Sequence, residues 1–158
     1  MISMISSVGK NRELGKNNDL IWHFKEDMKF FKETTMGHTV VMGYNTYKSL
    51  PGDLPGRHII VVTSRNLDGV EVVNNIDEIV TEYKNSDEEI FICGGASIYR
   101  QFLPYADKLY LTEIDDSEEN ADTYFPEFDK DEWNKSFISE HESNDIKFIM
   151  YLYDRKVA

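Results

Sequence analysis

The segment Ile90-Phe-Ile-Cys-Gly-Gly-Ala-Ser-Ile-Tyr99 is the most informative stretch for the fold class of this chain. Its first four residues are apolar, as in a short buried strand, and the two glycines lead into a helix from about Ala96 to Leu103. Free backbone N–H groups at such a junction favour an anion, usually a phosphate. Because adjacent glycines are more often a plain turn, the segment predicts an α/β unit and leaves its ligand open.

The alternation of strand and helix extends in both directions along the chain. We expect further strands at Ile2–Val8, Thr39–Met42, Ile59–Thr63, Val70–Val73 and Leu109–Ile114, and helices at Lys25–Met36, Asn45–Leu50 and Ile76–Tyr83. A polar loop over Gly9–Asp19 and a terminal antiparallel hairpin over Ser136–Glu140 and Ile146–Tyr153 complete the pattern. This alternation is typical of a largely parallel sheet with helices on both faces. The sequence therefore predicts one α/β domain over residues 1–158.

Charge is distributed unevenly along the chain. The net charge is −12, yet residues 1–67 carry 9 bases against 6 acids, while residues 68–158 carry 8 against 23. The acidic balance argues against a nucleic-acid partner, and an anionic ligand should prefer surfaces built from the first part. The single cysteine excludes an internal disulfide framework, and no apolar run is long enough to span a membrane. We expect a cytoplasmic protein with no signal peptide and no membrane partner.

Asp27 is the most informative single residue. On a helix it shares one stripe with Phe24, Met28 and Phe31, and Phe30 lies on its other side. A carboxylate on an aromatic face costs free energy unless it has a hydrogen-bonding partner. No lysine or arginine nearby in sequence is an obvious partner, so a ligand with N–H donors is one explanation. The alternative is an ordinary acid in the first turn of a helix, where the macrodipole favours it.

Two other junctions also place polar groups after a strand. Gly43-Tyr-Asn-Thr46 follows a β-branched strand, and Thr63-Ser64-Arg65 follows the next strand with two hydroxyls and a guanidinium. Two strand-to-helix junctions at the carboxyl edge of a parallel sheet suit a dinucleotide diphosphate. The hydroxyl–arginine group suits a phosphomonoester. Each signal is weak alone, and together they indicate a phosphorylated cofactor.

Other chemistries are not supported by residue spacing. The four histidines lack metal-ligand spacing, so no metal site is predicted. No nucleophile elbow or Ser-His-Asp order is present, and Cys93 is interpreted as a small residue at a strand end. The acids from Asp115 to Glu119 are expected to form a solvated loop.

Seven groups of residues follow one another along almost the whole chain: Val8-Gly9…Leu14-Gly15…Leu20-Ile21-Trp22…Asp27…Phe31, Val41-Met42-Gly43…Thr46, Leu54-Pro55-Gly56-Arg57, Thr63-Ser64-Arg65, Gly94-Gly95…Ile98-Tyr99, Leu109-Tyr110-Leu111-Thr112 and Asp122-Thr123…Phe125-Pro126. In this order they resemble bacterial dihydrofolate reductase. The resemblance implies a single domain with a mixed, mostly parallel eight-stranded sheet and flanking helices. It also implies hydride transfer from NADPH to C6 of dihydrofolate with protonation at N5, in one-carbon metabolism. A monomer that binds antifolate inhibitors is then expected.

The resemblance assigns residues to the substrate. Asp27 matches the acid that hydrogen-bonds the pterin 2-amino group and N3, and Thr112 matches the threonine that supports it. Trp22 matches a tryptophan that holds an ordered water beside the pterin, which makes these three the expected catalytic residues. Arg57 matches the arginine that grips the substrate α-carboxylate, for which a bidentate fork is suited. The expected apolar walls are Ile5, Met28, Phe31, Leu50 and Leu54.

The resemblance also assigns residues to the cofactor. The segment from Leu14-Gly15 to Leu20 matches a mobile loop that closes over the nicotinamide, and a hydroxyl at Ser7 is expected to meet the nicotinamide carboxamide. Tyr99 and the two adjacent glycines are expected to flank the nicotinamide and the diphosphate. The full expected set is Ser7, Leu14, Gly15, Asn18, Leu20, Gly43, Tyr44, Asn45, Thr46, Thr63, Ser64, Arg65, Cys93, Gly94, Gly95, Ala96, Ser97, Ile98, Tyr99 and Gln101.

Four positions depart from the family pattern. Ile21 stands where proline is usual before the tryptophan, and Ser6-Ser7 replaces a commonly alanine-rich pair. Pro51-Gly52-Asp53 replaces a more basic stretch near the expected glutamate tail, and Tyr44 stands where arginine or lysine often supports the cofactor phosphates. We therefore expect NADPH to be preferred over NADH by a smaller ratio than in a relative with arginine at position 44.

Two alternatives remain open at this point. A reductase of riboflavin synthesis has the same fold, but it would not need Asp27 or Arg57 at these positions. A catalytically silent pterin- or nucleotide-binding module is the other alternative, and the combination of acid, loop and cofactor glycines argues against it.

Overall fold

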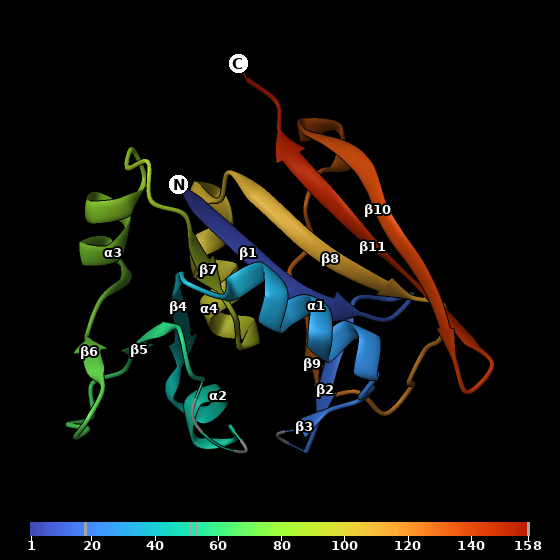
Figure 1. The fold of residues 1–158 in the computed structure, drawn as a ribbon, viewed down its shortest axis with the longest axis horizontal. Coiled ribbons are helices and arrows are strands. Elements are labelled where there is room, and N and C mark those ends of the chain that lie inside the picture. The colour runs from blue at the N-terminus through green and yellow to red at the C-terminus, as the bar shows by residue number, and fades with distance from the viewer. Residues whose placement is uncertain (18, 51, 53, 158) are drawn as a thin grey trace.

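The computed structural model describes residues 1–158 except residues 18, 51, 53 and 158. Its main strands are β1 (Ile2–Val8), β4 (Thr39–Gly43), β5 (His58–Val62), β6 (Glu71–Val73), β7 (Ile90–Ile92), β8 (Lys108–Ile114), β10 (Trp133–Ser143) and β11 (Ile146–Arg155). The helices are α1 (Lys25–Thr35), α2 (Tyr44–Lys48), α3 (Ile76–Tyr83) and α4 (Ala96–Phe102), with short 3-10 turns η1 (Leu103–Tyr105) and η2 (Lys130–Glu132). The strands form one sheet in the order β10-β11-β8-β1-β7-β4-β5-β6 (Figure 1).

Most neighbouring strands of this sheet are parallel. The pairs β1–β7, β1–β8, β4–β7, β4–β5 and β5–β6 are parallel, whereas β11 is antiparallel to both β8 and β10. β1 lies inside the sheet and its Ile2, Met4, Ile5 and Val8 are buried, because strands covered on both faces must be apolar on both. The expected mixed, mostly parallel eight-stranded sheet is confirmed.

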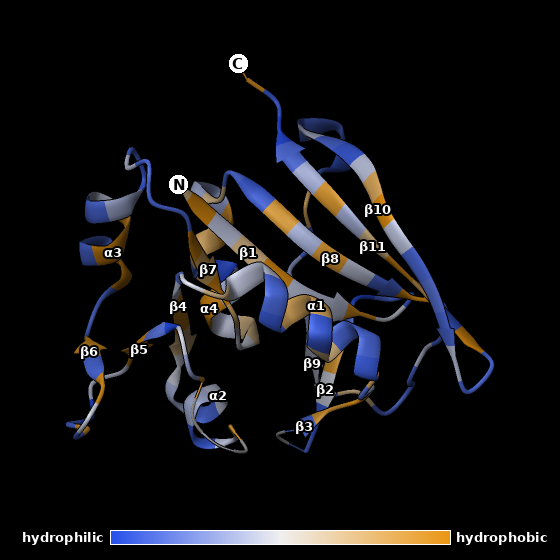
Figure 2. Ribbon diagram, viewed as in Figure 1, coloured by the Kyte–Doolittle hydropathy of each residue, from blue (hydrophilic) through white to orange (hydrophobic). Residues whose placement is uncertain are grey.

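Helices cover both faces of the sheet, and the alternation along β4 divides the core between them. Val40 and Met42 belong to a cluster that includes Phe30 and Phe31 of α1. Val41 belongs to a second cluster, together with apolar residues of α3 and α4. Figure 2 shows apolar residues along the strands and polar residues on the outer turns of the helices. Both faces are thus closed by amphipathic helices.

A second, three-stranded sheet corrects one expectation. The strands β2 (Glu13–Lys16), β3 (Asp19–Leu20) and β9 (Thr123–Tyr124) pair in the order β3-β2-β9, where a polar loop over Gly9–Asp19 was expected. Glu13 is only 1% exposed, and its carboxylate accepts the backbone N–H groups of Asn11 at 2.8 Å and Glu118 at 2.7 Å. The strand was missed because it is short and its charged side chain points inward to backbone donors.

The remaining boundaries lie close to those expected. α3 begins and ends where the sequence places it, and α1 ends just before Gly37, whose φ of +80° is the left-handed conformation that glycine adopts freely. The terminal hairpin is longer than expected at its outer ends, and β10 also continues past Glu140 to Ser143 at the turn. None of the helices within the described residues is long and apolar enough to cross a membrane.

The sheet topology determines where a site can form. Because β1, β4, β5, β7 and β8 run in the same direction, the loops that follow them open at one edge of the sheet. That edge contains the polar segments singled out in the sequence, and ligands of open α/β sheets bind outside the carboxyl ends of the strands.

Candidate active site

Asp27 lies in the first turn of α1, and hydroxyls from two strands hold its carboxylate. Thr112 Oγ1 on β8 donates to Asp27 Oδ1 at 2.6 Å, and Ser7 Oγ on β1 donates to Oδ2. Ser7 and Thr112 are direct register partners in the parallel β1–β8 pair, so their side chains point to the same face of the sheet. One carboxylate thus receives two hydroxyls, one on each oxygen.

The environment of Asp27 acts on its pKa in two directions. Burial raises the pKa of Asp27 above its ordinary value, while the hydrogen bonds from Ser7 and Thr112 and the charge of His141 oppose this rise. Among the described residues, no lysine or arginine forms an ion pair with Asp27, so its direct hydrogen-bond donors within the protein are the two neutral hydroxyls. The carboxylate is therefore suited to a ligand that brings further N–H donors.

The hydroxyl of Ser7 has a partner within the protein that the sequence did not indicate. It donates to Asp27, and its expected contact with the nicotinamide carboxamide stays a prediction. Alternation along β1 turns the Ser7 side chain toward α1, on the same face as Ile5. Thr112, in contrast, contacts Asp27 as expected.

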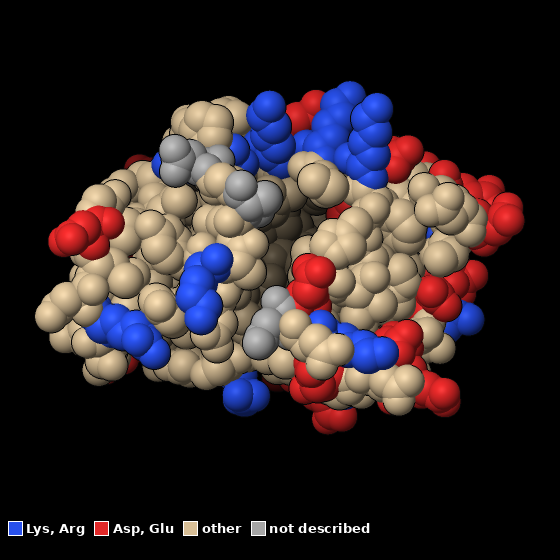
Figure 3. Space-filling view, turned by 90° about the horizontal axis from the view of Figure 1, so that it is seen from below, with Lys and Arg blue, Asp and Glu red and all other residues tan. Residues whose placement is uncertain are grey.

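Most of the expected apolar wall is assembled beside Asp27. Ile5, Phe31, Leu50 and Leu54 all belong to the cluster that packs between α1 and the sheet. Met28 is the exception, because it is 62% exposed and lies outside this cluster. Figure 3, which views the molecule from below relative to Figure 1, shows a deep hollow in this face, with basic side chains gathered along one rim.

Arg57 lies near the other end of α1. Its Nη1 donates to Thr35 Oγ1 at 3.4 Å, and Nε donates to the carbonyl of Pro55 at 3.3 Å. This arginine, Leu50 and Leu54 also line a cavity of about 810 Å³ whose other walls come from α2, β5 and the start of β6, and none of its described lining residues belongs to α1. Since Thr35 is two helical turns beyond Asp27, the carboxylate and the guanidinium region are separated by roughly 12 Å along α1. An elongated ligand with N–H donors at one end and an anion at the other matches this spacing.

The indole N–H of Trp22 has a partner within the protein. It donates to Asp116 Oδ2 at 3.0 Å, and the expected ordered water beside the pterin stays a prediction. The contact holds the pKa of Asp116 below its ordinary value. The acidic segment after β8 was expected to be a solvated loop, but it contributes this acceptor and the backbone contact to Glu13.

The sheet edge beyond β4 and β7 has the geometry of an anion site. The backbone N–H of Gly43 donates to the carbonyl of Gly94 at 2.9 Å, which places the two strand-to-helix junctions side by side. Gly43 caps α2 and Gly95 caps α4, and neither helix has a side-chain cap hydrogen bond. A Cβ on Gly94 or Gly95 would lie 3.5 Å from Thr46 Oγ1, so the glycines leave this space clear. Uncapped N–H groups beside open backbone fit a diphosphate.

Arg65 is held by an aromatic ring. Its guanidinium carbon lies 4.3 Å from the ring centroid of Tyr44, and Lys48 Nζ lies 5.5 Å from the same ring. Ser64 and Arg65 are exposed after β5, and Thr63 Oγ1 accepts the backbone N–H of Arg65 at 3.2 Å. Tyr44 thus contributes by orienting a cation, even though it replaces the cation common in relatives.

Comparison with known proteins places this geometry in a family. The family model for Dihydrofolate reductase matches residues 1–155. The chain belongs to the dihydrofolate reductase family. A dihydrofolate reductase of Bacillus subtilis (strain 168) is 41% identical over 160 residues, which cover 96% of this chain and 94% of that protein. HdrB of Haloferax volcanii is 38% identical over 165 residues (97% and 82%), and the type 3 enzyme of Salmonella typhimurium is 40% identical over 149 residues (92% and 90%).

Membership of the dihydrofolate reductase family confirms the resemblance seen in the sequence. The chain is an oxidoreductase of folate metabolism. Each of the three relatives is named a dihydrofolate reductase, so the alternative in riboflavin synthesis is not favoured.

In this member of the family, the segment expected to be a mobile loop is tied to β9 and the segment before it. Gly15 pairs with Leu20, and its carbonyl accepts the backbone N–H of Asp122 at 3.0 Å. Asp122 Oδ2 in turn accepts the backbone N–H of Asn17 at 2.9 Å. Leu14 is buried in the core and Leu20 is 58% exposed, so of these two leucines Leu20 is the one available to a ligand at the surface. Asn18, Pro51 and Asp53 lie outside the described residues.

The other expected cofactor residues divide into buried and exposed groups. Tyr99 is buried and its hydroxyl donates to the carbonyl of Ile5 at 2.7 Å, while Ile98 lies beneath Gly43. Ser97 and Gln101 are exposed and bonded to each other at 3.1 Å. Desolvation raises the pKa of the Cys93 thiol to about 12, which agrees with a structural residue and not with a nucleophile.

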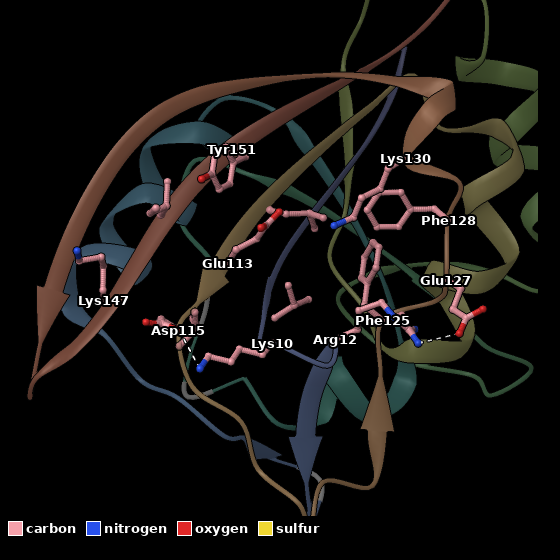
Figure 4. Close-up of a pocket in the computed structure, with 15 residues that line it drawn as sticks. Lys10, Arg12, Glu113, Asp115, Phe125, Glu127, Phe128, Lys130, Lys147 and Tyr151 are labelled. Atoms are coloured by element: carbon pink, nitrogen blue, oxygen red, sulfur yellow. Dashed lines mark hydrogen bonds and ion pairs between the residues drawn. The ribbon is translucent and has the colours of Figure 1, made fainter.

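A second cavity, of about 670 Å³, lies on the opposite face of β1, β8 and β11 (Figure 4). Val8 and Glu113 line it, and alternation places them on the other side of their strands from Ser7 and Thr112. Figure 4 shows that its Lys10 pairs with Asp115 and its Arg12 with Glu127, both at 3.1 Å. This cavity is separate from the Asp27 site.

Proposed function

We propose that the protein reduces 7,8-dihydrofolate to 5,6,7,8-tetrahydrofolate with NADPH, hydride passing to C6 and a proton to N5. The observation that carries the proposal is the carboxylate of Asp27, which two hydroxyls hold and no cation of the described residues neutralises. Such a group is suited to two N–H donors of a pterin, its 2-amino group and N3.

Substrate binding follows from the residues along α1. The pterin would lie against Ile5 and Phe31, with Thr112 supporting Asp27, and the aminobenzoyl group would contact Leu50 and Leu54. Arg57 would bind the α-carboxylate, where its planar fork gives two parallel hydrogen bonds. Met28 lies at the exposed rim, and a bound substrate would cover it.

The residues at the carboxyl edge of the sheet fit NADPH. The N–H groups beside Gly43 and Gly95 would hold the diphosphate, with Thr46 and the first turns of α2 and α4 around it. Ser64 and Arg65 would bind the 2′-phosphate. When bound, NADPH supplies the hydride.

The chain's own residues supply the rest of the chemistry. Asp27 fixes the orientation of the pterin and, as an anion, favours protonation of the ring. The ring of Trp22 packs closely over Gly9, where a Cβ would lie 2.5 Å from it, and its N–H donates to Asp116, so Trp22 would hold the segment before α1 against this loop. The β2–β3 segment would exclude water from the nicotinamide end.

The wider context is proposed on the same basis. A reductase of this kind supplies one-carbon metabolism and binds antifolates, and we propose that residues 1–158 act as one monomeric domain in the cytoplasm. Size-exclusion chromatography with light scattering tests the monomer, and trimethoprim inhibition tests the antifolate site.

A substrate panel tests the proposed reaction. Oxidation of NADPH should depend on dihydrofolate, should yield tetrahydrofolate, and should be absent with a ribosylated aminopyrimidine. Oxidation with the pyrimidine alone would support the riboflavin-type activity. Tight dihydrofolate binding without oxidation would support a silent module.

A further inference from the structure

The two hydroxyls on Asp27 divide its hydrogen-bonding capacity evenly. An ionised carboxylate has about four acceptor positions, two on each oxygen. Thr112 takes one on Oδ1 and Ser7 takes one on Oδ2. One position on each oxygen therefore remains for a ligand, which is the arrangement that two parallel N–H donors require.

Ser7 contacts Asp27 from a hydrogen-bonded strand of the sheet, β1, and not from a flexible segment. It pairs with Thr112 near the carboxyl end of the β1–β8 ladder, one pair before Val8 and Glu113, and its side chain is half-buried. The paired strand fixes the position of the Ser7 Cβ, and the staggered rotamer that the side chain adopts places its hydroxyl against Asp27. An alanine at this position, as in the pair commonly found in the family, would leave Oδ2 without a protein donor.

We propose that Ser7 is a positioning residue for Asp27, and that its hydroxyl fixes the carboxylate plane so that the pterin meets an oriented pair of acceptors. This inference rests on the proposed function for its consequence in catalysis. Its structural part, the control of Asp27 by Ser7, is independent of any substrate.

Removal of the Ser7 hydroxyl should raise the pKa of Asp27 and weaken the binding of dihydrofolate. A donor to a carboxylate stabilises the ionised form, so its loss raises the pKa of Asp27 further. The other titratable groups near Asp27 are His141 of β10, which lowers its pKa, and Tyr99 of α4, whose own pKa Asp27 raises. Loss of the fixed plane also weakens dihydrofolate binding, because the ligand must then orient the carboxylate itself.

The test compares Ser7→Ala with Ser7→Thr and a matched control. Ser3→Ala removes a buried serine hydroxyl from the same strand, where Ser3 Oγ donates to Glu89 Oε2 at 2.6 Å, and leaves Asp27 untouched. The titration midpoint of Asp27 is read from carboxyl carbon NMR of the free protein, and kcat and KM for dihydrofolate are measured separately.

We expect Ser7→Ala to raise the midpoint by about one pH unit and KM by roughly tenfold, as loss of a hydrogen bond to a charged group implies. Ser7→Thr, which keeps the hydroxyl, should titrate like the wild type, and Ser3→Ala should change neither quantity. Ser7→Cys, a weak donor, gives a second variant that should shift the midpoint in the same direction as Ser7→Ala.

An unchanged midpoint in both Ser7→Ala and Ser7→Cys overturns the inference, as does an equal shift in Ser3→Ala. If the wild type fails to reduce dihydrofolate but the Asp27 titration midpoints of the variants shift as expected, the proposed function is refuted and the control of Asp27 by Ser7 still holds. A shifted midpoint with unchanged KM in an active enzyme refutes the positioning role.

Discussion

Replacing Arg65 by alanine should remove most of the preference for NADPH over NADH. The two cofactors differ by one 2′-phosphate, and Arg65 is the cation placed beside Ser64 at the end of β5. A hydrogen bond to a charged group is worth about 1.5–3 kcal/mol, which corresponds to roughly a 10- to 150-fold fall in the ratio of kcat/KM values. The assay is steady-state oxidation of both cofactors at saturating dihydrofolate.

Tyr44 makes this prediction specific to the present structure. Its ring lies 4.3 Å from the Arg65 guanidinium, and an exposed cation–π contact contributes about 0.5–1 kcal/mol. Tyr44→Leu should therefore lower the NADPH/NADH ratio by about two- to fivefold. Tyr44→Phe keeps the ring face and should leave the ratio unchanged. An unaltered ratio in Arg65→Ala would show that the 2′-phosphate is bound elsewhere.

Three further outcomes are expected. Arg57→Leu should weaken the binding of methotrexate, which carries the α-carboxylate, by about 2–5 kcal/mol in calorimetry. Binding of trimethoprim, which lacks that carboxylate, should be unaffected. Equal losses for both ligands would mean that Arg57 acts through the fold. Asp122→Ala removes the acceptor for the backbone N–H of Asn17 in the segment from Leu14 to Leu20, so kcat should fall. The unfolding free energy should change by no more than ~0.5 kcal/mol, and a large loss of stability would contradict a role limited to this segment. Burial raises the pKa of Asp27, so its ionised form destabilises the folded state at pH values above that pKa. Asp27→Asn should therefore raise Tm at neutral pH, and this increase should disappear below the ordinary carboxyl pKa. An increase in Tm that is the same at every pH would refute this linkage.

Elements defined by periodicity were predictable from the sequence. α3 and the strand–glycine–helix unit at β7 and α4 have apolar spacing and turn residues that indicate them locally. The β3-β2-β9 sheet was not predictable, because β2 has four residues and one of the two backbone donors to its buried Glu13, the N–H of Glu118, is distant in sequence. Short strands depend on their partners, and no local pattern specifies those partners.

The site shows the same limit. Asp27 was identifiable because a carboxylate on an aromatic helix face needs a partner, but the partner itself depended on strand register. Once β1 and β8 are known to pair in parallel, alternation places Ser7 and Thr112 on one face. The donor of Trp22 and the ring contact of Arg65 depend on side-chain rotamers between distant segments, which the sequence does not display.

The most direct test of the central claim is dihydrofolate-dependent oxidation of NADPH by the wild type and by Asp27→Asn. Both proteins should be folded, as checked by thermal melting, and should bind NADPH with similar affinity. We expect the wild type to turn over and Asp27→Asn to lose about 100- to 10,000-fold in kcat/KM, the range typical of acid–base assistance. Near wild-type activity in Asp27→Asn would contradict the role of this carboxylate, and no oxidation by the wild type would contradict the proposed reaction.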